Sequence, residues 1–136
     1  MAHEHSVYML LADTAAQRRD ADAVERYAPR LQALAERDDH RLFLAIAHRA
    51  WGVALRLRGR HDAAEARLQQ ARLMFGQLST NWQLARTLVE LAELALARGE
   101  TAIARGHLTQ ALAGFEAMGA RPDVERTRAA LAALDT

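Results

Sequence analysis

The sequence predicts an all-α protein, an α-solenoid of about three helix-turn-helix units followed by a C-terminal closing helix. Apolar residues recur at the three- and four-residue spacing of amphipathic helices, and breaks interrupt them at regular intervals. Residues 41–80 also align with residues 81–120 without a gap. Such a period is typical of repeat proteins, in which each unit buries its apolar face against its neighbours. We therefore expect a single domain over residues 1–136, a right-handed superhelix of about seven antiparallel helices, with units at about 1–40, 41–80 and 81–120 and the closing helix at 121–136.

The repeat is carried by small, apolar and turn residues at an offset of forty positions. The identical pairs are Leu44/Leu84, Ala45/Ala85, Arg58/Arg98, Gly59/Gly99, Ala64/Ala104, Leu68/Leu108, Gln70/Gln110, Ala71/Ala111 and Phe75/Phe115. These are the residue types that a helical hairpin needs at its close contacts, in its core and in its turn. Residues that are small here are expected to be steric requirements.

Seven helices are predicted from the apolar periodicity and its breaks. Gly59 and Gly99 suit the left-handed conformation that closes a helix, and Gly119 is expected to end the sixth helix. The predicted ranges are 6–18, 21–36, 41–58, 61–77, 81–98, 101–117 and 122–134.

Capping residues support these boundaries. Asp39 is expected to cap the third helix, Asn81 or Thr80 the fifth, and Thr101 the sixth. Pro122 fits the first turn of the seventh helix. One residue conflicts with the pattern, because Pro29 removes a hydrogen bond inside the second helix and should kink or shorten it.

Composition favours a protein without a membrane or nucleic-acid role. The 136 residues contain 18 basic residues, all arginine, and 17 acidic residues, so the formal net charge is only +1. Direct nucleic-acid binding would need a clustered basic excess, and no apolar run is long enough to cross a bilayer. The absence of cysteine excludes disulfides and thiol chemistry. Met1 to His5 does not resemble the start of a secretory signal, so a cytoplasmic location is expected.

No pattern points to catalysis, a cofactor or a metal. The glycines stand singly at helix ends instead of forming a phosphate loop. His3 and His5 could bind a transition metal, but the alternative of a frayed polar terminus is favoured. Asp38 and Asp39 could act as paired carboxylates, but helix capping is the favoured interpretation because they precede an apolar run.

Small and apolar positions of each unit resemble the tetratricopeptide repeat. The second unit carries them at His48, Trp51, Gly52, Leu55, Ala64, Leu68 and Ala71, and the third at Leu88, Leu91, Ala92, Ala95, Ala104, Leu108 and Ala111. The first unit matches more loosely at Tyr8, Leu11, Ala12, Ala15, Val24, Ala28 and Leu31. This resemblance implies a non-catalytic module that binds proteins or peptides.

Two departures from that repeat are visible. The period is forty residues, against about thirty-four in the usual repeat. The customary proline at the end of the second helix is missing after Phe75 and Phe115. In its longer helices and longer second turn the chain resembles the sensor region of bacterial maltose-type transcription activators and similar ATPase-linked regulators.

Histidine and aromatic residues on these helices have two interpretations each. His48 is either a packed, hydrogen-bonded core histidine, which is favoured, or a ligand contact. Trp51 is expected to be structural and Trp82 to be half exposed. Phe75 and Phe115 occupy equivalent ends of second helices and are expected to pack between units.

The binding surface of such a solenoid is expected on its concave side, lined by the first helix of each unit. Gln17 belongs to this face, and four arginines alternate there with apolar residues, a pattern that suits an acidic partner with an aliphatic anchor. Arginines that only solubilise a helix face are the alternative. The candidate groove residues are Met9, Asp13, Ile46, Arg49, Val53, Arg56, Leu57, Arg86, Val89, Glu93, Leu96 and Arg126.

Three functions follow, in order of preference. The first is a protein-interaction or scaffold module that binds a peptide or helix in this groove. The second is a sensor segment of a bacterial signalling ATPase or transcription regulator that responds to a small ligand or a partner. The third is an all-α enzyme. The apolar run at residues 129–134 further predicts a homodimer or a part of a longer repeat array.

Overall fold

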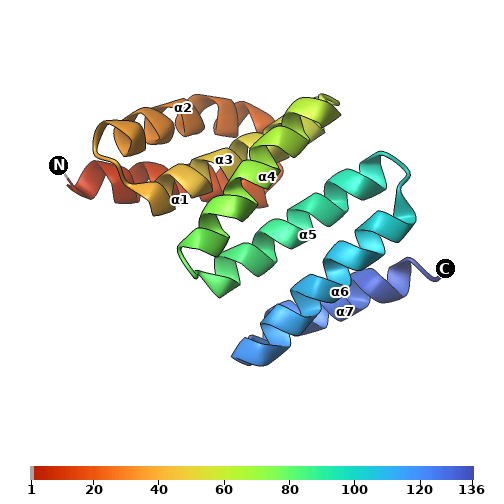
Figure 1. Cartoon of the computed structure of the whole chain (residues 1–136). Coiled ribbons are helices and arrows are strands. Elements are labelled where there is room, and N and C mark those ends of the chain that lie inside the picture. The colour runs from red at the N-terminus through yellow and green to blue at the C-terminus, as the bar shows by residue number, and fades with distance from the viewer. Residues whose placement is uncertain (1) are drawn as a thin grey trace. The chain divides into compact units, whose positions relative to one another are not determined.

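The computed structural model describes residues 2–136, and the side chains from residue 4 onward (Figure 1). Within this range the chain forms helices and short turns, without a strand. The helices are α1 (Ala2–Gln17), α2 (Ala21–Arg37), α3 (Arg41–Leu57), α4 (His61–Gln77), α5 (Asn81–Ala97), α6 (Thr101–Met118) and α7 (Arg121–Ala133). No helix among the described residues has the length and apolarity that a membrane span requires.

The predicted all-α fold and its helix boundaries are confirmed. Helices α2 to α6 begin at the predicted residues and end within one residue of them. The first helix differs, because it begins at Ala2 and not at residue 6. The early start brings polar residues such as Glu4 and His5 into the helix.

One turn geometry recurs every twenty residues. After each helix from α1 to α5, the second residue has a positive φ, and after α6 the first residue does. These residues are Arg19, Asp39, Gly59, Ser79, Gly99 and Gly119. The N–H of the next residue then donates to the carbonyl five positions back, as in Arg60 to Leu55 at 2.9 Å and Glu100 to Ala95 at 2.8 Å. This is the Schellman closure, which satisfies carbonyls that the end of a helix leaves without partners.

The capping predictions are partly wrong. Asp39 does not cap α3, because it is the left-handed residue of the turn; His40 caps the helix instead, its Nδ1 accepting from the N–H of Phe43 at 3.4 Å. Thr80 is the N-cap of α5 without a side-chain cap bond, and its hydroxyl donates back to Phe75 O at 3.2 Å. Thr101 is the first helical residue of α6, not its cap.

The predictions for the three turn glycines and for Pro122 are confirmed, and the prediction that Pro29 shortens its helix is not. Gly59 and Gly99 are left-handed, Gly119 ends α6, and Pro122 lies in the first turn of α7. Pro29 does not shorten α2, which runs from Ala21 to Arg37 around it. Pro29 is solvent-exposed, so the carbonyl that loses its N–H partner is on the side where water can hydrate it.

The chain divides into two compact units, Met1–Met74 and Phe75–Thr136. The first contains α1 to α3 and most of α4, and the second contains α5, α6 and α7. The boundaries of the three forty-residue repeats, the single domain and the superhelical course of the chain stay predictions.

Close packing in the first unit depends on small residues in the α3–α4 hairpin. Gly52 is buried, and a Cβ built on it would lie 2.5 Å from Leu68 Cδ2 and Cγ. Leu68 and Ala64 are themselves fully buried, so these side chains have little room to move. The expectation that glycine and alanine are steric requirements here holds for this hairpin.

The core of the second unit is built in the same way from small residues. Ala92, Ala95, Ala104 and Leu108 form a buried cluster between α5 and α6. Val89 of α5 and Ala130, Leu131 and Leu134 from the C-terminal end pack against it. Part of the apolar run at residues 129–134 is therefore used within the unit, and the homodimer or longer array stays a prediction.

Gly52 and Gly106 offer a matched test of the packing. Replacing Gly52 with alanine should destabilise the protein by about 1–3 kcal/mol, because the methyl group overpacks against Leu68. Gly106 lies inside α6 with nothing within 4 Å of an added Cβ. Gly106→Ala should therefore stabilise by roughly 0.5–1 kcal/mol through the lower backbone entropy of the unfolded chain. Chemical denaturation of both variants measures the contrast, and equal effects would contradict the close approach at Gly52.

Candidate functional site

An exposed stripe runs along α5 in the second unit. Five residues three or four positions apart share one face of this helix. Trp82 is 43% exposed, as predicted, and Leu96 is 37% exposed. The residues between them are half-buried. We call this set the α5 stripe: Trp82, Arg86, Val89, Glu93 and Leu96.

Trp82 is fixed at one end of the α5 stripe by polar contacts. Its Nε1 donates to Asp123 Oδ2 at 3.0 Å, and the Arg86 guanidinium lies over the indole ring, 4.9 Å from its centroid. The other Asp123 oxygen accepts from Arg126 at 2.6 Å. Asp123 therefore links the Trp82 indole to the Arg126 guanidinium, while Arg86 lies over the ring. Arg86 and Arg126, two residues that the sequence suggested for the groove, both belong to this cluster.

The candidate groove residues of the first unit are less accessible. Leu57 is exposed, and Met9, Asp13 and Arg56 are half-buried. The prediction of an exposed groove position is wrong for three further residues, because their side chains are buried. These are Ile46, Arg49 and Val53.

Arg49 is buried together with a carboxylate. Only 2% of the residue is exposed, and its Nη2 lies 3.2 Å from Asp13 Oδ1. Gln17 donates to the other oxygen of the same carboxylate at 2.9 Å. A buried guanidinium needs such a partner because the desolvation of an unpaired charge is costly. Arg49 and Asp13 therefore link α3 to α1, which is a structural role.

An open hollow of about 650 Å³ lies in the first unit between α3 and α4. It contains two arginines, a histidine and no carboxylate. Its lining residues are His48, Trp51, Leu55, Arg60, Ala63, Ala66, Arg67 and Gln70. A second hollow of about 340 Å³ shares Trp51, Leu55 and Arg60 with the first.

Arg67 is held in the larger hollow by neutral groups. Its Nη1 donates to Gln32 Oε1 at 3.0 Å and to His48 Nδ1 at 2.9 Å, and the guanidinium lies 5.5 Å from the centroid of the Trp51 ring. Burial lowers the pKa of Arg67. The pKa of His48 is also lowered, first by burial and then by the Arg67 charge. His48 is therefore neutral, with Nδ1 as the acceptor.

Sequence reasoning missed this hollow. His48 is hydrogen-bonded, as the favoured interpretation had it, yet it also lines the hollow, as does Trp51. The available signal was on α4, where Arg67 stands between Ala63, Ala66 and Gln70 and faces the aromatic residues of α3. Small residues around a long cation leave space beside the cation.

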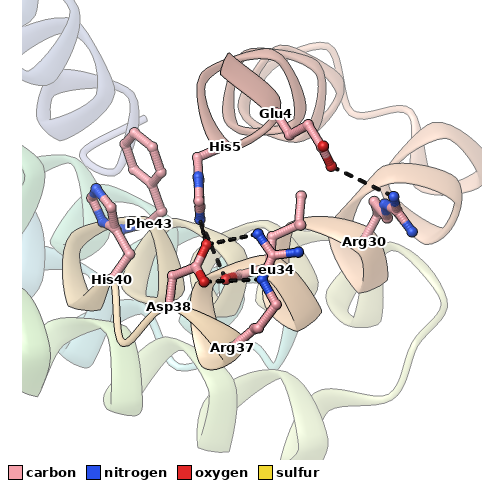
Figure 2. A network of polar contacts seen from close by, with 8 residues as sticks. All are labelled: Glu4, His5, Arg30, Leu34, Arg37, Asp38, His40 and Phe43. Atoms are coloured by element: carbon pink, nitrogen blue, oxygen red, sulfur yellow. Dashed lines mark hydrogen bonds and ion pairs between the residues drawn. The ribbon is translucent and has the colours of Figure 1, made fainter. Parts of the chain in front are cut away.

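Near the N-terminus, a polar network replaces the frayed end that the sequence suggested (Figure 2). His5 is buried, and its Nε2 lies 3.3 Å from Leu34 O and 2.9 Å from Asp38 Oδ2. Arg37 donates to both Asp38 oxygens and lowers the pKa of that carboxyl. Asp38 is thus an ionised structural acceptor. The preference for a frayed terminus is wrong for His5, and the His3 side chain lies outside the described residues.

No metal centre is formed by these groups. The His5 ring lies 5.5 Å from the His40 ring, and His40 stacks on Phe43 at 4.0 Å while it caps α3 (Figure 2). In the described part of the chain, no three histidine, aspartate or glutamate residues are arranged to hold a metal ion.

A model of the tetratricopeptide repeat matches residues 42–117, more than half of the chain. The chain belongs to the tetratricopeptide repeat family. The match runs from the first turn of α3 to the end of α6 and so includes the larger hollow and the whole α5 stripe. No curated protein matches the sequence. Tetratricopeptide repeats are generally protein-interaction modules and typically non-catalytic; the likeness to maltose-type regulators stays a prediction.

The buried ion pair of this repeat protein can be tested by removing its negative partner. Asp13→Asn removes the carboxylate charge that faces the buried Arg49 and should destabilise by roughly 2–4 kcal/mol, somewhat less than a fully buried pair. Asp22→Asn is the control, because Asp22 pairs with Arg58 on an exposed surface and should cost under about 0.5 kcal/mol. Urea denaturation distinguishes the two. Similar small losses would show that Arg49 does not depend on Asp13.

His48 should make stability depend on pH. Because its pKa is lowered in the folded state, the unfolded chain binds the proton more readily, and stability falls as the pH drops below the ordinary histidine value of about 6.5. The loss should grow until the lowered folded-state pKa is passed. His48→Gln should reduce the loss between about pH 7.5 and pH 5.5. His61→Gln, which leaves His48 in place, should retain it; equal slopes in all three proteins would refute the assignment.

Proposed function

We propose that this chain is a non-catalytic interaction module that binds a peptide or helix of a partner protein along the α5 stripe. The observation that carries the proposal is the exposed Trp82, which lies under Arg86 and donates to Asp123, the carboxylate that also accepts from Arg126, in a tetratricopeptide repeat protein. Tryptophan and arginine are the residue types that dominate binding energy at protein interfaces. Their fixed positions lower the conformational entropy lost on binding.

The chemistry of the α5 stripe suits an acidic segment with an aliphatic anchor. Arg86 and Arg126 can each donate to a carboxylate of the partner. Trp82 and Leu96 offer exposed apolar surface at the two ends of the stripe. Glu93 lies between them and would repel an acidic residue at that point. The preferred partner therefore has its acidic residues near Trp82 and its aliphatic residue near Leu96.

The runner-up function, a sensor segment of a bacterial regulator, has a separate support. The hollow around Arg67 has the size of a small-molecule site and lies in the first unit, away from the α5 stripe in sequence. A segment with both a partner surface and a small-ligand site would suit regulation.

The test uses labelled peptides in which two glutamates lie three or four residues from a leucine, together with matched peptides that carry glutamine. The double variant Arg86→Ala/Arg126→Ala should weaken binding of the acidic peptides by roughly 10- to 100-fold and flatten the salt dependence. Fluorescence anisotropy measures both. Arg128→Ala is the matched control, because Arg128 is also exposed on α7 and also pairs with a carboxylate, that of Glu116.

The outcomes separate cleanly. Thermal melting should change little in all variants, since ion pairs on exposed surfaces contribute little stability. If the double variant binds the acidic peptides as tightly as the unaltered protein, or if glutamine peptides bind equally well, the α5 stripe is not the binding surface.

A further inference from the structure

Arg67 is a partly desolvated cation without an anion. Among the described residues it contacts the neutral groups of Gln32, His48 and Trp51, and no carboxylate lies within ion-pair distance. Glu36 is near enough to raise the pKa of Arg67, but this effect is smaller than the lowering by burial. Arg49 shows how the same chain treats a fully buried arginine, because Asp13 compensates it at 3.2 Å. In the part of the chain that the structure describes, Arg67 has no such ion-pair partner where it lines the hollow.

Trp51, a lining residue of the hollow, has a donor without an acceptor. Trp51 Nε1 is buried and has no hydrogen-bond partner among the described residues. A buried N–H of this kind costs free energy unless an acceptor reaches it. Both contacts of the Arg67 guanidinium come from Nη1, which leaves Nε and Nη2 as further donors. The hollow therefore has unused guanidinium donors beside the Trp51 ring.

We propose that this hollow binds a small organic acid. The carboxylate of the ligand accepts hydrogen bonds from Arg67, and Arg60 adds a second positive charge at the site. The apolar body of the ligand lies against Leu55, Ala63 and Ala66.

Size and charge favour a monocarboxylate with an apolar body. A volume of about 650 Å³ falls in the range of small-molecule sites. Half of the lining consists of Trp51, Leu55, Ala63 and Ala66, which provide no hydrogen bonds for the many oxygens of a phosphate apart from the indole N–H. The nearby Glu36 charge also opposes a dianion more strongly than a monoanion. The site lies in the first unit and shares no residue with the α5 stripe of the second.

The test observes the Trp51 indole directly. The protein has two tryptophans, so in the Trp82→Phe variant the single indole N–H signal of a ¹⁵N-labelled sample belongs to Trp51. Benzoate and phenylacetate are the probes. Either or both should shift this signal progressively to saturation, whereas benzamide, which has the shape of benzoate without its charge, and inorganic phosphate should not. If neither carboxylate shifts it, or if benzamide or phosphate shifts it equally, the proposal is overturned.

Variants of α4 identify the residue responsible. Arg67→Gln in the Trp82→Phe background should weaken carboxylate binding roughly tenfold or more, because a charged hydrogen-bond donor is lost. Arg72→Gln is the matched control on the same helix, outside the lining of either hollow, and should bind normally. Equal binding by both variants overturns the role of Arg67.

A second pair protects the test against misfolding of Arg67→Gln. Ala66 is exposed and lines the hollow, so Ala66→Glu should fold and should abolish carboxylate binding by placing a competing anion in the site. Leu73→Glu adds the same charge at an exposed position of α4 outside the lining and should bind as before. Unchanged binding in the folded Ala66→Glu protein overturns the location of the site.

Discussion

The Schellman turn that recurs every twenty residues is the constraint on which both units depend. The hydrogen bond from the residue after the turn to a carbonyl five positions back ends each helix at a fixed residue, so that α2, α3, α4 and α5 all have 17 residues. Equal helices joined by equal turns bring equivalent positions to equivalent places in each hairpin. Val24, Ala64 and Ala104 are accordingly all fully buried, and so are Phe75 and Phe115 to within 2%. Residues that bind ligands or partners can then vary on a backbone that the turns already determine.

Arginine is the only residue type in this chain that stays positively charged at neutral pH, because the sequence contains no lysine. The surroundings of each arginine decide its role. Arg49 is fully buried and paired with Asp13, so it joins two helices. Arg67 is partly desolvated among neutral groups, so its remaining N–H donors are available to an anion. Arg126 is exposed and only anchored by Asp123. The planar guanidinium suits all three settings, because it stacks on indole rings and donates in several directions at once.

The sequence was sufficient for the helices but not for the solvent exposure of their faces. Apolar periodicity and the glycines at 59, 99 and 119 were enough to place the boundaries, since both follow from local backbone chemistry. The left-handed residues Arg19, Asp39 and Ser79 carried no such signal. Residues other than glycine adopt this backbone conformation only where the hydrogen bond that closes the turn outweighs the steric cost of the Cβ atom. Periodicity also assigned Arg49 to the groove face of its helix but could not show that the side chain is buried. The hollow beside Arg67 is lined by residues of α3, α4 and the turn between them, and so appears only in the folded chain.

Protonation and anion binding would be coupled in the Arg67 hollow. The Arg67 charge is one of the two causes that lower the pKa of His48, and the hydrogen bond between them requires His48 Nδ1 to be unprotonated. A carboxylate bound to Arg67 would offset that positive charge and so raise the pKa of His48. By linkage, protonation of His48 would strengthen binding of the acid, because each event changes the free energy of the other by the same amount. Arg67 and His48, together with the Glu36 charge that raises the pKa of both, would then make a small-acid site sensitive to pH.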